Sequence, residues 1–354
     1  MMSALDAALA AIMIAHAVDI SRLSAHEQVK VLDLLKQLEA DLTKLLAVNV
    51  LSEMGKRDTA SVLREITALV QEVYTEAALT TQATVTELAP LSADMTAQAM
   101  EQVLNITIGP GSKPSAGYLD ALARDLLIQG SPMADWFSKQ AGDIQFRIAA
   151  ELRKGMIAGE TNAQIIARIM GKNGEPGVMD IARKNAAALV QTATSTVANQ
   201  SKLAMYHKNA DITNGIQWNS TLDSHTCIEC ANLDGQKWDL EGAALPGTTM
   251  PYQEAPAHVN CRCVMLSVLK PMSEISGGML PDLPKNGSRA STDGPVPATT
   301  TFADWLKGRT EAQIAEQFGK GRAELFKSGK IGLRDMLDMS GNPIDLATLR
   351  AKYG

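Results

Sequence analysis

The four cysteines of this 354-residue chain are its most reactive side chains, and all of them occur in two short motifs. The first motif is Cys227-Ile-Glu-Cys230, and the second is His258-Val-Asn-Cys261-Arg-Cys263. Two residues between cysteines let a tight turn aim both sulfurs at one metal ion, and thiolates with an imidazole are common ligands of tetrahedral Zn²⁺. We therefore predict one structural zinc ion, bound by Cys227 and Cys230 with two of His258, Cys261 and Cys263.

Other chemistries for these cysteines are alternatives at this stage. Disulfide bonds need an oxidising compartment, which nothing in the sequence indicates. A redox CxxC pair needs a thioredoxin-like βαβ setting, and a zinc deaminase needs His-x-Glu before Pro-Cys-x-x-Cys; the sequence has neither. Four reduced cysteines without a metal are a further alternative. A catalytic zinc ion would need an open position and a base, and Glu229 and His225 are the nearest groups, so no catalytic residue is predicted.

Short strands are expected to position the two motifs. Residues 215–222 alternate in polarity and end at Asp223, as a strand does. Residues 233–238 contain an Asp-Gly turn and predict a hairpin, and residues 264–269 are an apolar run typical of a buried strand. If this last strand begins early enough, Cys261 and Cys263 lie on one of its faces.

Helices account for the rest of the predicted fold. Aromatic residues are only 4% of the chain and methionine is abundant at 17 residues, which favours a helical core over a β-sandwich. Apolar residues at steps of three and four form two stripes on either side of a break at residues 55–58, namely Val31, Leu35, Leu38, Leu42 and Leu45, then Leu63, Ile66, Val70 and Val73. They predict a helical hairpin over about 26–88, either as ordinary core helices or as an arm that docks on a partner.

Local signals complete the predicted organisation. Ser131-Pro132 indicates a helix start, Thr161 and Gln164 a capping box, and residues 178–206 a long helix. The fold class is mostly α with a small β element (α+β). We expect four segments: a helical N-terminal arm, a domain with the Cys/His cluster, a linker rich in Pro, Gly and Ser, and a small helical tail, which span 1–105, 117–269, 270–300 and 301–354.

The distribution of charge limits the function. The net charge is −6, and residues 1–100 carry all of it, with 7 basic and 13 acidic side chains. A protein that coats nucleic acid would be basic, so the acidic N-terminal part is expected to meet protein. The longest early apolar stretch, residues 7–15, is too short to span a bilayer, and no Lys or Arg precedes Arg22. We expect no membrane association and a cytoplasmic protein.

The motifs resemble those of the phage head morphogenesis proteins typified by the Mu F-like minor head protein. The order of strand, Asp, CxxC, Asp-Gly and His-x-Asn-Cys-Arg-Cys carries the resemblance, within residues 217–235 and 256–263. Segments 152–170 and 305–350 are similar to the family's helical lead-in and tail, so the resemblance covers roughly residues 145–354. Val259 stands where the family usually has Pro, and Gln191-Thr-Ala-Thr stands in place of an Arg-Thr-Glu run.

The resemblance implies a role that the residues alone do not. It implies a minor structural protein of a tailed-phage head, present in several copies inside the capsid near the portal and made in the host cytoplasm. Its expected partners are the portal protein and the major capsid or scaffolding protein, with packaged DNA as a further candidate. Its role is head assembly, with DNA packaging or delivery as an extension. The rival functions are a zinc-dependent nuclease or other nucleic-acid-processing enzyme, and a DNA-binding module.

Overall fold

The computed structural model describes residues 4–49, 56–171, 175–279, 287–338 and 340–354. The protein is 64% helical with a few small antiparallel sheets, which confirms the predicted fold class. The chain divides into two compact units: residues 1–20, 89–119 and 198–354 form the first, and residues 21–88 and 120–197 form the second. Helices α1, α2 and α6 each contribute residues to both units.

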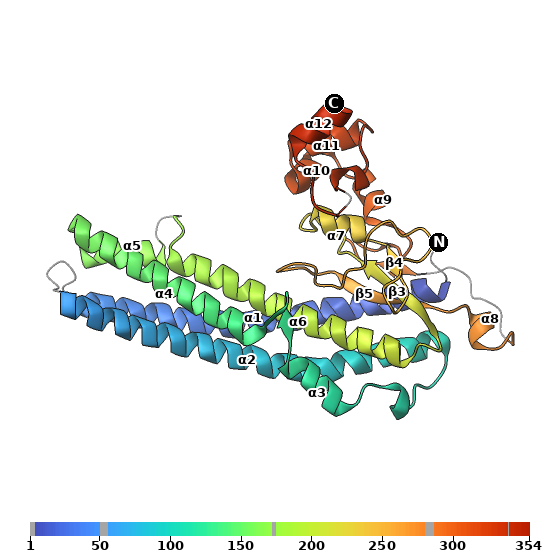
Figure 1. The fold of residues 1–354 in the computed structure, drawn as a ribbon, viewed down its shortest axis with the longest axis horizontal. Coiled ribbons are helices and arrows are strands. Elements are labelled where there is room, and N and C mark those ends of the chain that lie inside the picture. Colours follow the sequence, from blue (N-terminus) through green and yellow to red (C-terminus); the bar gives the residue numbers. More distant parts are fainter. Residues whose placement is uncertain (1–3, 50–55, 172–174, 280–286, 339) are drawn as a thin grey trace. The chain divides into compact units, whose positions relative to one another are not determined.

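The second unit is a layer of long helices. Helices α1 (Ala4–Val48), α2 (Lys56–Leu104), α4 (Met133–Ala158) and α6 (Val178–Lys208) supply its length, and α5 (Asn162–Met170) packs on α4 (Figure 1). Side chains join the helices: Ser24 Oγ donates to Gln191 Oε1 at 3.0 Å, and Gln140 Nε2 donates to Asn185 O at 3.1 Å. A two-stranded ladder, β1 (Leu127–Ile128) with β2 (Ser131–Pro132), leads into α4.

The predicted apolar stripes form the core of this unit, with small shifts. Val31, Leu35, Leu38 and Leu42 are buried as expected, but the next buried residue is Leu46, and Leu45 is only half-buried. On α2 the buried set is Val62, Ile66, Val70 and Tyr74, so Leu63 and Val73 were misplaced. A straight α-helix turns every 3.6 residues, so a stripe written with period 3.5 drifts off the buried face.

Two helix predictions have clear outcomes. The capping box is confirmed, since the Thr161 hydroxyl accepts from Gln164 N and the Gln164 side chain accepts from Thr161 N. The predicted helix start at Ser131 is wrong, because Ser131-Pro132 pairs as β2 and Pro132 caps α4 without a side-chain bond.

Helix α1 is long and apolar enough to cross a membrane by length and composition alone, and 33% of its most apolar window is buried inside the protein.

A three-stranded antiparallel sheet is at the centre of the first unit. The order is β4 (Lys237–Trp238), β3 (Thr213–Asn219), β5 (Val264–Leu269), with Ile216 opposite Trp238 and Trp218 opposite Met265. All six residues of β5 are buried, as predicted for this run. Helix α6 covers it: Asn199 Nδ2 donates to Cys263 O and Asn199 Oδ1 accepts from Met265 N.

The predicted hairpin over residues 233–238 is wrong. Leu233 ends a short helix, α7 (Ile228–Leu233), and the Asp-Gly turn, with Gly235 at φ +80°, leads into β4, which pairs with β3 instead. Cys261 and Cys263 precede β5 rather than lying on it. The Asp-Gly signal was correct about a turn, but a capping Cys227 and tertiary pairing decide what the turn joins.

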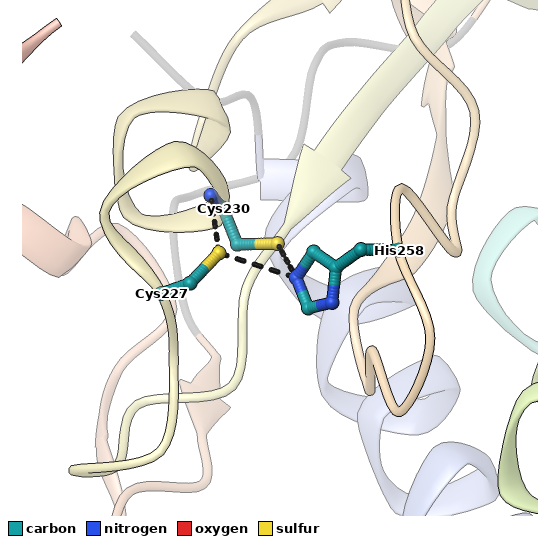
Figure 2. Close-up of side chains that lie close together, drawn as sticks. All are labelled: Cys227, Cys230 and His258. Carbon is teal, nitrogen blue, oxygen red and sulfur yellow. Dashed lines mark hydrogen bonds between the residues drawn. The ribbon is translucent and has the colours of Figure 1, made fainter. Parts of the chain in front are cut away.

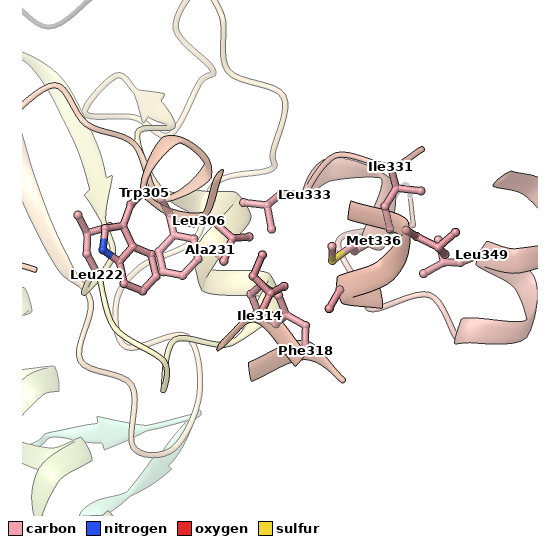
Figure 3. Close-up of a cluster of buried hydrophobic side chains, with 13 residues drawn as sticks. Leu222, Ala231, Trp305, Leu306, Ile314, Phe318, Ile331, Leu333, Met336 and Leu349 are labelled. Atoms are coloured by element: carbon pink, nitrogen blue, oxygen red, sulfur yellow. The ribbon is translucent and has the colours of Figure 1, made fainter. Parts of the chain in front are cut away.

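The chain after β5 folds on the first unit as well. It contains α8 (Met272–Ile275), β6 (Ser288–Arg289) paired with β7 (Val296–Pro297), and a helical tail of α9 (Phe302–Lys307), α10 (Glu311–Phe318), α11 (Lys320–Lys327) and α12 (Leu346–Tyr353). Short 3₁₀ turns lie at Pro110–Ser112 and Arg334–Met336, and α3 spans Ala116–Arg124. The tail helices share one apolar cluster with Leu222 and with Ala231 of α7 (Figure 3).

Candidate metal centre

Helix α7 positions the first pair of cysteines. Cys227 occupies the N-cap position, and its sulfur accepts the backbone N–H of Cys230 at 3.3 Å. A helix N-terminus carries partial positive charge, which favours the thiolate form of a nearby cysteine. The first turn of α7 therefore aims both sulfurs to the same side.

The loop before β5 supplies the opposite pair. A turn in which Cys261 N donates to His258 O at 3.2 Å holds these two residues together, with Asn260 at φ +66°. His258 Nδ1 lies 2.9 Å from Val259 O. A carbonyl oxygen can only accept, so Nδ1 carries a proton. Nε2 is then the ring nitrogen that faces the sulfurs and could bind a metal once it is deprotonated, as in metal-binding histidines oriented by an outer partner.

The donor atoms converge from these two elements (Figure 2). His258 Nε2 lies 3.2 Å from the sulfurs of both Cys227 and Cys230, and the sulfurs of Cys230 and Cys261 are 3.8 Å apart. Zinc bound tetrahedrally at about 2.3 Å from sulfur and about 2.0 Å from nitrogen separates sulfurs by about 3.8 Å and sulfur from nitrogen by about 3.5 Å. These three distances are close to the expected values, and Cys261 approaches the first group through Cys230 alone. The donor types and these spacings are therefore compatible with part of a tetrahedral shell.

All five predicted ligands are brought together, in two overlapping groups. One group is Cys227, Cys230 and His258, and the other is Cys230, Cys261 and Cys263; within each, all donor atoms lie within 4.8 Å of one another. Cys263 differs from the other cysteines because its thiol donates to Ser220 Oγ at 3.7 Å. The structure thus contains more candidate ligands than one tetrahedral shell can take.

The pKa values reflect this crowding of sulfurs. The neighbouring Cys230 thiol, and then His258, lower the pKa of Cys227 to about 5. The Cys227 thiolate in turn raises the pKa of His258 to about 9. Cys230 also lowers the pKa of Cys261, whereas burial raises that of Cys263 well above its usual value. Cys227 and Cys261 are therefore the cysteines that most readily present thiolates.

An outer layer of contacts holds the two ligand loops. Arg262, between the last two cysteines, forms a bidentate ion pair with Asp223 at 2.6 and 3.0 Å. Thr221 Oγ1 donates to Arg262 O at 3.2 Å, and Ser220 Oγ donates to Cys230 O at 2.5 Å. Asp223 was expected as a turn former and as part of the family motif, whereas nothing local in the sequence marks Ser220, because its contacts depend on the tertiary fold.

A second buried network, around Asp234, holds the Asp-Gly turn that follows α7. Asp234, with a 1% exposed side chain, pairs in bidentate fashion with Arg289, which is 4% exposed. The bond lengths are 3.0 and 3.1 Å, and Asp234 also accepts the backbone N–H groups of Ser220 at 2.8 Å and Phe302 at 2.7 Å. This carboxylate therefore ties β3, the β6 segment and the tail together.

The groups considered as a catalytic base are poorly placed for that role. His225 is exposed and belongs to neither group of donor atoms. Glu229 is partly buried in the first turn of α7, and its burial together with the Cys227 charge raises its pKa. Neither residue donates or accepts a hydrogen bond with the cluster in the part of the chain that the structure describes.

A known protein family matches the part of the chain that holds these candidate ligands. Residues 147–266 match the family of phage Mu protein F-like proteins, a stretch that runs from α4 through β3 and α7 into β5 and includes all five candidate ligands. The match supports the resemblance that the motifs predicted. Neither the curated proteins nor the solved structures contain a match to this chain.

Proposed function

We propose that this protein is a minor structural component of a tailed-phage head, associated with the portal, whose central domain is stapled by one structural zinc ion. The family match supports a role in head morphogenesis. The observation that supports the zinc site is that Cys230 of α7 belongs to two groups of close donor atoms, one with Cys227 and His258 and the other with Cys261 and Cys263.

The proposed shell is closed. Four protein donors fill a tetrahedral ion and leave no position for water or substrate, which distinguishes structural from catalytic zinc. Cys263 would then be an outer residue that packs beside Ser220. Such a site stabilises the fold and provides no catalytic turnover, so we infer that the protein is not an enzyme.

Zinc would also hold the tail in place, through α7. One side of this helix presents Cys227 and Cys230, while Ala231 and Ile228 pack into the tail cluster. Gln317 Nε2 donates to Thr226 O at 2.6 Å, and Asn232 Nδ2 donates to Leu333 O at 3.0 Å. Chelation should therefore expose residues 302–353 to protease along with the ligand loops, while the second unit stays resistant.

Two experiments test the role in the head. Cross-linking of purified particles should join this chain to the portal protein, and its recovery only with major capsid protein or outside particles would contradict portal association. Purified protein supplied with Zn²⁺, Mg²⁺ or Mn²⁺ should leave DNA and RNA intact. Cleavage that Glu229→Gln or His258→Ala abolishes would favour the nuclease instead.

A further inference from the structure

A groove of 690 Å³ lies between α1 and α2 within the second unit. Leu34 and Leu38 of α1 and Leu69 and Val73 of α2 line it with apolar surface. Leu38 is buried, whereas the other three are only partly covered. A groove lined by apolar side chains between two antiparallel helices is a common binding site for a third, amphipathic helix.

The rim of this groove is acidic. Asp41, Glu72 and Glu76 contribute carboxylates, and no Lys or Arg lines the groove. Lys44 pairs with Asp41 at 3.4 Å, while Glu72 and Glu76 have no ion pair in the described part of the chain. The sequence contains no Lys or Arg between Arg64 and Lys113, so α2 itself supplies no positive charge near Glu72 and Glu76. The groove therefore suits a basic amphipathic helix.

Helix α4 of the same unit presents such a face to solvent. Phe146 is 74% exposed and Ile157 is 89% exposed, although both are large apolar side chains. Steps of four, three and four residues place Phe146, Ala150, Arg153 and Ile157 on one side of the helix. Arg147 and Arg153 are exposed and form no ion pair within the described ranges. Arg153 lies on this face between its apolar ends, and Arg147 flanks the face, about 100° around the helix from Phe146.

We propose that α4 of one copy of this chain docks in the α1–α2 groove of a second copy. Residues 146–154 of α4 extend about 12 Å, and so do residues 68–76 along the groove, at about 1.5 Å per residue. Phe146 would enter the apolar groove, while Arg147 and Arg153 would meet Glu72 and Glu76. The two surfaces differ, so the contact is heterologous and forms either a ring or an open chain of copies.

Sedimentation of the purified full-length protein with charge-reversal variants tests this contact. The wild-type chain should self-associate at roughly 0.01 M salt and dissociate at roughly 1 M salt, because the charges are exposed and screened. Glu72→Lys/Glu76→Lys and Arg147→Glu/Arg153→Glu should each weaken association by about a hundredfold. An equimolar mixture of the two variants should associate again, because each retains the surface that complements the other.

A control pair separates this contact from a general effect of charge. Glu311→Lys/Glu316→Lys makes the same change on exposed positions of α10 in the other unit and should leave association unchanged. Circular dichroism of each variant should match the wild type, because every substituted residue is exposed. A wild-type chain that stays monomeric at low salt, or a variant mixture that fails to associate, overturns the proposal. If incorporation into heads requires the groove residues although the purified chain does not self-associate, the groove binds a different partner. That result would also overturn the proposal.

Discussion

The ion pair between Arg289 and Asp234 is predicted to be among the strongest single contributions to the first unit. Arg289→Met would remove both charged hydrogen bonds from a carboxylate whose side chain is 1% exposed. Breaking one partner of such a buried pair costs about 3–5 kcal/mol, because the remaining charge is left without compensation. The backbone donors Ser220 and Phe302 would still hold Asp234, which places the expected loss toward the lower end of that range.

Hydrogen exchange measures this loss at the site itself. The amides of Ser220 and Phe302 donate to Asp234, so their exchange should accelerate by roughly a hundredfold or more at about 1.4 kcal/mol per factor of ten. The matched control is Arg124→Met, which breaks exposed pairs with Asp120 and Asp125 and should leave the exchange of these amides unchanged. Equal effects of the two substitutions would refute the argument from burial.

Further predictions concern single residues. Burial lowers the pKa of Lys202 to about 8, so the unfolded chain binds more protons than the folded one between about pH 8 and 10.5. The free energy of unfolding should therefore rise with pH across that window. In denaturant unfolding, Lys202→Met should remove this rise and increase the free energy of unfolding by about 3 kcal/mol at pH 7. Gly215→Ala should cost at least about 1–3 kcal/mol in the same assay, because its Cβ would lie 2.2 Å from the Trp238 carbonyl oxygen, whereas Gly142→Ala on open helix surface should be neutral or stabilising. Cys227→Ser should abolish zinc binding while Cys263→Ser retains it, measured by metal analysis of each purified variant, and equal zinc loss would place Cys263 in the shell.

The sequence predicted elements whose signals are local. The buried run of β5, the Thr161 capping box and the long helix α6 depend on nearby residues, and each was correct to within a few positions. The closeness of the candidate ligands within each motif also followed from spacing, since the CxxC and His-x-x-Cys motifs each need only one turn to bring their side chains together. Their mutual approach could be expected only on the assumption that one metal joins them.

The remaining features depend on contacts between distant parts of the chain. Composition marked residues 270–300 as a linker, yet Arg289 is buried there, because one arginine among Pro, Gly and Ser gives no local signal of its partner Asp234. The turn after Leu233 was assigned to a hairpin because nothing in its own residues shows that α7 precedes it. The division of the chain into four segments stays a prediction, for which limited proteolysis is the direct test.

Elemental analysis of the protein purified without added metal tests the central claim most directly. The account predicts one zinc ion per chain, which strong chelation removes together with the protease resistance of residues 227–263. Protein that contains no zinc, and whose ligand loops resist protease equally with and without chelator, would contradict the account and leave the cysteines as packing residues.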